Sequence, residues 1–85
     1  MTTGTEDKIF DTLREVITRI AKVPPETVVP DAPVSGLQNV DSIVLLEIVV
    51  TMENELGIEI DEEELFDIDT VGQFVAACRR IVEAG

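Results

Sequence analysis

Apolar residues recur at three- and four-residue spacing in two long stretches of the chain, and this spacing predicts two amphipathic helices. The first helix is predicted from Thr5, a capping residue, to about Lys22, and the second from Thr70 to near Gly85. The apolar positions of the first stretch are Ile9, Phe10, Leu13, Val16, Ile17 and Ile20. Those of the second stretch are Val71, Phe74, Val75, Cys78, Ile81 and Val82. Each helix has one apolar face, so both are expected to pack onto a common core.

A third long helix is predicted to begin at Asp41-Ser42 and to end at about Leu56, where Gly57 is well placed to terminate it. Apolar residues nearly encircle this helix, so it must be covered on more than one side. Its core side is expected to carry Leu46, Val49 and Met52.

The connections differ in length. Residues 23–41 hold all four prolines and show no clear period, which predicts a long loop. Five apolar residues are expected to pin this loop onto the core: Val28, Val29, Val34, Leu37 and Val40. Residues 58–60 alternate like a strand but have no partner strand. Asp61 and Glu64 then resemble a capping box before Leu65-Phe66, which predicts one short helix. Thr70 and Gln73 repeat that signature.

These elements predict an all-α fold: a small four-helix bundle of three main helices and one short helix, with a long loop between the first two. We expect a single domain spanning residues 1–85, with its core at about 6–83. A chain of 85 residues leaves little room for a substrate cavity, which favours a monomeric carrier or binding module over an enzyme.

The charge balance restricts the partners. There are 18 acidic and 6 basic residues, a net charge of −12, which repels nucleic acid and anionic lipid and attracts basic protein surfaces. The chain shows no basic segment followed by an apolar run at its start and no long apolar stretch, so a cytoplasmic location is expected.

Few residues offer chemistry of their own. There is no histidine, and the single cysteine, Cys78, falls on an apolar helix face, as a structural thiol does. Asp67, Asp69 and Gly72 suggest a calcium loop, but Val71 and Cys78 stand where two further ligands are needed, so no metal site is predicted. The remaining candidate is Asp41-Ser42, which by itself is an ordinary helix cap.

The surroundings of this dipeptide resemble the acyl carrier protein family, including the peptidyl carriers. The resemblance covers roughly residues 6–82. It is carried by Val40-Asp41-Ser42-Ile43, Glu47, residues 52–60 and Asp69-Thr70-Val71. It implies that Ser42 bears a covalent 4′-phosphopantetheine, whose thiol carries acyl or aminoacyl groups while the protein itself catalyses nothing. The implied partners are a phosphopantetheinyl transferase, loading enzymes, and ketosynthases or other pathway enzymes with basic docking patches.

The resemblance also implies that partners dock on the helix after Ser42. The residues of this predicted docking set are Asp41, Ile43, Val44, Glu47, Val50, Thr51 and Asn54. Val44 stands where fatty-acid carriers typically have an acid, Ile43 replaces the usual Leu, and residues 37–40 depart from the usual Leu-Gly pattern. These departures favour a polyketide or nonribosomal peptide pathway, with fatty-acid synthesis as the alternative. From another class, an acidic helical adaptor without a prosthetic group also fits the composition.

Overall fold

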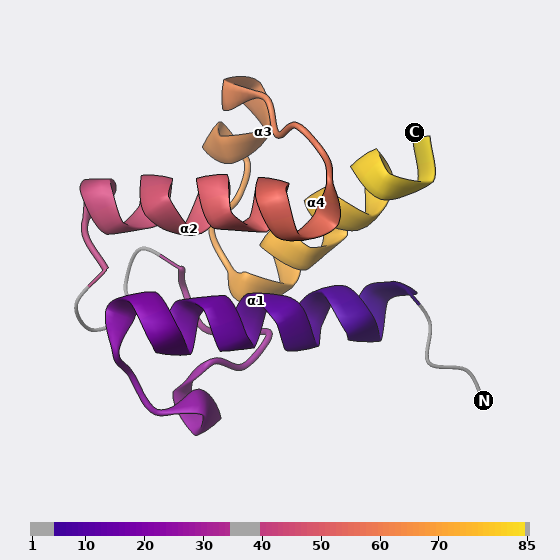
Figure 1. Ribbon diagram of the computed structural model, residues 1–85. Helices are drawn as coiled ribbons and strands as arrows, with labels where there is room; N and C mark the ends of the chain where they lie inside the picture. Colours follow the sequence, from indigo (N-terminus) through magenta and orange to yellow (C-terminus); the bar gives the residue numbers. More distant parts are fainter. Residues whose placement is uncertain (1–4, 35–39, 85) are drawn as a thin grey trace.

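The computed structural model describes residues 5–34 and 40–84, with side chains from Lys8 onward. This part of the chain contains four α-helices, α1 (Thr5–Ala21), α2 (Ser42–Leu56), α3 (Glu62–Phe66) and α4 (Val71–Ala84), and no strand (Figure 1). A single 3₁₀ turn, η1 (Pro25–Thr27), lies in the connection between α1 and α2. The predicted fold class, an all-α bundle of three main helices and one short one, is confirmed. No helix in the described ranges is long and apolar enough to cross a membrane.

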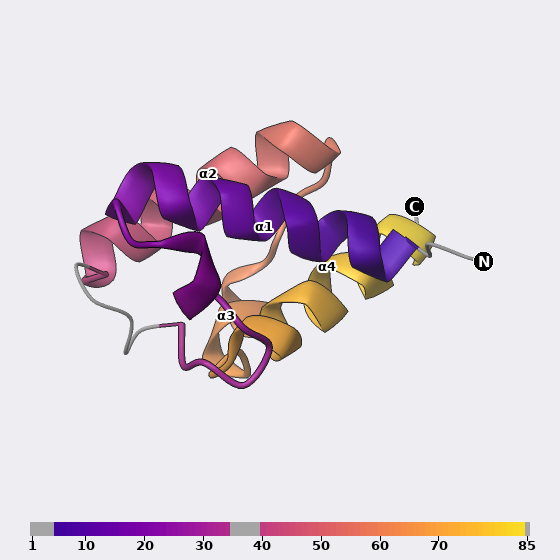
Figure 2. The same cartoon turned by 90° about the horizontal axis from the view of Figure 1, so that it is seen from below.

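Helix α1 is the element on which the others assemble, since both α2 and α4 pack against it. Helices α1 and α2 lie side by side and run in opposite directions (Figure 1). The first turn of α1 and the last turn of α4 lie at the same end of the molecule, as Figures 1 and 2 both show. The start of α2 therefore lies at the opposite end, beside the last turn of α1.

The core is entirely apolar among the described residues. Its largest fully buried side chains come from all three long helices and from the loop. They are Ile9, Leu13, Val16, Ile17, Val28, Val34, Ile48, Met52, Val71, Phe74 and Cys78. The predicted core positions of α1 and α4 are confirmed, although Phe10, Ile20, Ile81 and Val82 are only partly buried.

The described part of the long loop contains a 3₁₀ turn and packs onto the core, in agreement with the expected ordered loop. Helix α1 ends at Ala21, because Lys22 takes a left-handed conformation with φ of 58°. The η1 turn was not predicted, and it is held by the Thr27 hydroxyl, which donates to the Pro24 carbonyl at 2.7 Å. Val28, Val34 and Val40 are buried as predicted.

Two of the loop residues that were expected to pack onto the core, Val29 and Leu37, are not among the buried residues that the structure describes. The expectation that Val29 packs onto the core is wrong, because Val29 begins a tight turn to Ala32 and its side chain is 45% exposed. Leu37 lies outside the described residues, as do the side chain of Thr5 and the whole of Gly85.

Three backbone hydrogen bonds join the loop to the start of α4. Val34 N donates to Asp69 O, Val71 N to Ala32 O and Gly72 N to Pro30 O, each at 2.9 Å. A Cβ atom on Gly72 would lie 3.2 Å from the Pro30 carbonyl oxygen, so a larger residue would push that carbonyl away by a few tenths of an ångström. The loop that leads to α2 is thereby fixed to a segment about 40 residues further along the chain.

The ends of the later helices test the predicted caps. Gly57 ends α2 in a left-handed conformation with φ of 66°, as predicted. Thr70 and Gln73 form the reciprocal capping box of α4, with both bonds at 3.1 Å. The capping box predicted at Asp61 is wrong: its side chain makes no capping bond, and Asp61 contributes only its carbonyl, to Glu64 N at 3.0 Å. Residues 58–60 form no strand.

Candidate functional site at the start of α2

Ser42 is the first residue of α2 and is exposed to solvent. Asp41 caps the helix: its Oδ1 accepts a hydrogen bond from Val44 N at 2.9 Å, and its carbonyl accepts from Leu45 N at 2.8 Å. The bond to Val44 N satisfies one of the amides that a helix start leaves open, and the bond to Leu45 N is the first regular bond of the helix. The amides of Ser42 and Ile43 have no acceptor among the described residues. An exposed hydroxyl and two open amides thus share the first turn.

The electrostatics of this turn suit a phosphate ester. The aligned peptide dipoles of a 15-residue helix place partial positive charge at its N-terminus, where a phosphate is stabilised. The first turn of α2 contains no acidic residue, and the carboxylate of Asp41 is already engaged in the cap. The residues present at Ser42 therefore fit a phosphopantetheine group by their chemistry.

The predicted docking set divides into two groups in the structure. Asp41, Ile43, Glu47, Val50 and Asn54 are exposed. Val44 and Thr51 are half-buried: Val44 packs against the core, and the Thr51 hydroxyl donates to the Glu47 carbonyl at 2.8 Å. Four of the seven predicted residues thus lie exposed on α2, and Asp41 lies exposed directly before it.

One residue of this face was predicted to lie in the core. Leu46 is 56% exposed, so its expected place on the core side is wrong. The buried positions of α2 are Ile48, Val49 and Met52. Leu46 lies about 200° around the helix from Ile48, so the two cannot face the same core. Because apolar residues occur on all sides of α2, the sequence alone offered no signal to separate them.

The other candidate groups of the sequence carry no chemistry here. Cys78 is buried in α4, and burial raises the pKa of its thiol from 9.0 to about 11, so it is protonated at neutral pH and unreactive. The described residues contain no group of three His, Cys, Asp or Glu side chains placed to hold a metal ion. In the suspected calcium loop, Val71 and Cys78 are both core residues.

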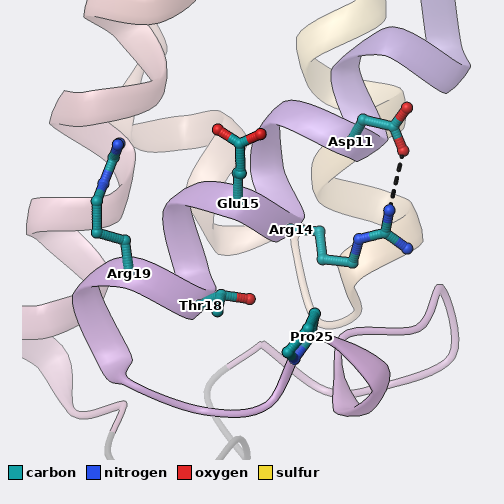
Figure 3. Close-up of a pocket in the computed structure, with 6 residues that line it drawn as sticks. All are labelled: Asp11, Arg14, Glu15, Thr18, Arg19 and Pro25. Carbon is teal, nitrogen blue, oxygen red and sulfur yellow. Dashed lines mark hydrogen bonds and ion pairs between the residues drawn. The ribbon is translucent and has the colours of Figure 1, made fainter.

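A hollow lies along α1, and Figure 3 shows the side chains around it. It is lined by Asp11, Arg14, Glu15, Thr18, Arg19 and Pro25. Arg14 pairs with Asp11 at 3.3 Å and lies 5.3 Å from the centre of the Phe10 ring. Acids and bases alternate along this open surface, and Ser42 is not part of it. The hollow therefore contributes nothing to the site at α2.

Comparisons with known proteins agree with this geometry. Residues 11–78 match the family model described as "Phosphopantetheine attachment site". An acyl carrier protein of Thermobifida fusca is 36% identical over 66 residues, which span 78% of this chain and 84% of the relative. A meromycolate extension acyl carrier protein of Mycolicibacterium smegmatis is 30% identical over 80 residues, spanning 94% of this chain and 81% of the relative.

The matched segment contains α2, the α1–α2 loop, α3 and most of α4, so the similarity extends over the elements that surround Ser42. The family model is described by its phosphopantetheine attachment site, and it matches most of the chain. The cofactor of this chain is therefore a covalent 4′-phosphopantetheine. The described residues form four helices, the start of α2 is exposed, and the relatives named above are acyl carrier proteins. The chain therefore belongs to the acyl carrier protein family.

Proposed function

We propose that Ser42 bears the phosphopantetheine arm and that the chain serves as a non-catalytic, cytoplasmic carrier of acyl thioesters. The observation that supports this most is the exposure of Ser42 at the start of α2, beside two open amides. The sequence contains one other serine, Ser35. Of these two serines, only Ser42 is the first residue of a helix in the described structure. The N-terminus of that helix can stabilise a phosphodiester.

The modification itself is a group transfer from coenzyme A. The Ser42 oxygen forms a bond to the phosphorus of the phosphopantetheine, the bond from that phosphorus to 3′,5′-ADP breaks, and the serine proton passes to a base of the transferase. This chain supplies the exposed hydroxyl and the helix start that holds the ester. When attached, the arm supplies a terminal thiol that forms thioesters with the cargo.

The carrier acts by tethering. A cargo attached to the protein meets each enzyme at the effective concentration set by the docked complex and the length of the arm, so weak docking is sufficient. The exposed face of α2, which begins at Ser42, is the proposed docking surface. Its residues are Asp41, Ile43, Leu46, Glu47, Val50 and Asn54, with Val44 and Thr51 at its edge.

For the pathway, we place the carrier in dedicated biosynthesis of the polyketide or nonribosomal peptide type. Support comes from Ile43 and Val44, which leave the first turn of α2 without the acid that typical fatty-acid carriers have there. Extension of a fatty acyl chain is the second candidate, because several relatives are named for meromycolate extension. The mass of the thioester isolated from cells separates the two: a substituted ketide or aminoacyl group supports the first, and a long saturated acyl chain excludes it.

Intact-mass measurement tests the attachment site. The purified chain is incubated with coenzyme A and a phosphopantetheinyl transferase, and we expect a gain of one phosphopantetheine. Ser42→Ala is expected to abolish the gain, whereas Ser35→Ala, the matched control, is expected to keep it. Modification of Ser42→Ala would refute the assignment. No gain in the wild type with an active transferase would favour the acidic adaptor, in which Asp41-Ser42 is only a cap.

A further inference from the structure

The chain contains few side chains that could attack a thioester held near Ser42. Thiols, imidazoles and amines are the side-chain groups that react most readily with a thioester. There is no histidine, and the single cysteine, Cys78, is buried and protonated at neutral pH. Lys8 and Lys22 are the only lysines. Transfer of a cargo from the arm to a side chain of the protein itself therefore depends on where these two amines lie.

The two lysines lie at opposite ends of α1. Lys8 is near the start of the helix, and Lys22 directly follows its last residue, Ala21. Because a helix rises about 1.5 Å per residue, about 20 Å of α1 separates them. Figures 1 and 2 both show the last turn of α1 beside the first turn of α2, which begins at Ser42. Lys22, unlike Lys8, thus shares an end of the molecule with the proposed attachment site.

Lys22 is also accessible. It is exposed, and it forms no ion pair with any residue that the structure describes. Its backbone is left-handed, with φ of 58°, so the chain leaves the helix at this residue. By contrast, Arg14 and Arg80 are each paired with a carboxylate. No ion pair within the described structure has to break before the amine of Lys22 meets the arm.

The arm converts this proximity into a high local concentration. Phosphopantetheine joins pantoyl, β-alanyl and cysteamine units end to end, so the extended arm is longer than the roughly 8–10 Å between the axes of packed helices. Helices α1 and α2 pack against each other. A reactant on a short flexible tether meets its target at an effective concentration that is roughly millimolar. A thioester on Ser42 is therefore presented to Lys22 continuously, at any concentration of the protein.

We propose that Lys22 is a site of self-acylation, at which a cargo passes from the arm to the protein itself. The neutral Nζ of Lys22 forms a bond to the carbonyl carbon of the thioester, and the bond from that carbon to sulfur breaks. The electron pair of the broken bond leaves on the sulfur, which takes up the proton that the nitrogen loses. The products are an amide on Lys22 and a free thiol on the arm, so no further reactant is needed. This inference rests on the proposed role of Ser42.

Self-acylation limits the time for which a cargo can wait on the arm. A cargo that no enzyme removes is transferred to Lys22, and the arm regains a thiol that can be loaded again. Because an amide is far more stable than a thioester, each molecule undergoes the transfer once and keeps the acyl group as a lasting mark.

Mass spectrometry of the acetylated carrier tests the proposal. The transferase is supplied with acetyl-coenzyme A, which places an acetylated arm on Ser42 in one step. After incubation at mildly alkaline pH, hydroxylamine cleaves the remaining thioester but not an amide, and peptide mapping compares the acetylation of Lys22 with that of Lys8. Lys22→Arg keeps the positive charge and removes the nucleophile, and Lys8→Arg is the matched control. Ser42→Ala, mixed with the same concentration of acetyl-coenzyme A, measures transfer without the tether.

We expect at least about tenfold more acetyl on Lys22 than on Lys8 in the wild type, and little on either lysine in Ser42→Ala. The rate constant of the transfer is expected to stay the same when the protein is diluted about tenfold, because the reaction is intramolecular. Lys22→Arg is expected to prolong the life of the thioester, whereas Lys8→Arg is expected to match the wild type. Both lysines are exposed, and unchanged thermal unfolding of each variant verifies that the fold is retained.

Three outcomes overturn the inference. The first is equal acetylation of Lys22 and Lys8, because the acetyl groups would then come from solution. The second is a rate constant that falls in proportion to the protein concentration, because the transfer would then occur between molecules. The third is complete loss of the thioester from the wild type with no acetyl on Lys22, because hydrolysis alone would then account for the loss. A wild type that accepts no acetylated arm on Ser42 would instead refute the proposed function.

Discussion

Glu53 holds the segment that leaves α2 through two different oxygen atoms. Its backbone carbonyl accepts from Ile58 N at 3.0 Å, and its carboxylate Oε2 accepts from Ile60 N at 2.6 Å. Ile60 is buried and the bond itself is partly buried, so without Glu53 the amide would lose its partner in a place with little access to water. Glu53 thereby fixes the residues that lead into α3.

Substitution of Glu53 tests this role by hydrogen exchange of the Ile60 amide. Glu53→Ala removes the acceptor, and we expect exchange to accelerate by about tenfold or more, with a loss of about 1 kcal/mol in the free energy of unfolding. Glu53→Gln keeps an oxygen that accepts the bond and is expected to retain slow exchange. Equal exchange rates in all three proteins would contradict the role.

Because of Cys78, the free energy of unfolding is expected to depend on pH in the alkaline range. Burial raises the pKa of its thiol from 9.0 to about 11. The folded state therefore retains this proton at pH values where the unfolded state has lost it. The stabilising effect is complete below pH 9 and is lost as pH rises from about 9 towards about 11.

We expect the free energy of unfolding, measured with urea at a series of pH values, to fall across this window. Cys78→Ala leaves a cavity and lowers stability at every pH, but its unfolding free energy should fall less steeply between pH 9 and 11. The chain contains no tyrosine, whose titration would overlap this window. Parallel curves for the two proteins would contradict the assignment to Cys78.

At the scale of the elements, α2 and α3 both begin after an aspartate but are capped differently. The side chain of Asp41 accepts from Val44 N, whereas that of Asp61 makes no capping bond. We expect Asp41→Ala to lower the free energy of unfolding by about 1 kcal/mol. Asp61→Ala, the matched control, is expected to change it by less than about 0.5 kcal/mol. Urea denaturation measures both, and equal losses would show that the side-chain bond of Asp41 does not matter.

The loop between α1 and α2 also gains its order from another element. Its three hydrogen bonds to residues 69–72 hold residues 30–34, and Val34 is buried in the core. The conformation of this part of the loop thus depends on the start of α4.

For the whole molecule, the unequal distribution of charge is a source of instability. The net charge is −12, and residues 23–78 include no basic residue that could compensate the acids on α2 and α3. The only described ion pair that reaches α3 joins Arg80 and Glu64 at 2.8 Å. Repulsion among the remaining acids opposes the compact state.

Salt is therefore expected to stabilise the fold. Raising sodium chloride from about 20 to 300 mM should increase the melting temperature by roughly 5 °C, because screening weakens this repulsion. Glu55→Lys, a reversal at an exposed position of α2, should raise the melting temperature at low salt and reduce the salt effect. A melting temperature that is constant or falls with salt would contradict this explanation.

Features that depend on neighbouring residues could be predicted from the amino-acid sequence. Gly57 ends α2 because a glycine adopts the left-handed conformation without strain, and Thr70 and Gln73 cap α4 because they lie three residues apart. The start of α2 at Asp41-Ser42, and hence the location of the candidate site, follows from the same local chemistry. The periodicity of α1 and α4 also identified their core faces, since each has a single apolar side.

Which side of α2 is buried, and how the described part of the loop is held, depend on contacts between elements that are distant in the chain. An all-round apolar helix has no preferred face of its own, so contacts with the rest of the bundle buried Ile48 and left Leu46 exposed. The bonds between residues 30–34 and 69–72 join segments far apart in the chain, and no local pattern encodes that pairing. Burial is a property of the assembled molecule, and for this reason the exposure of Leu46 became visible only in the folded chain.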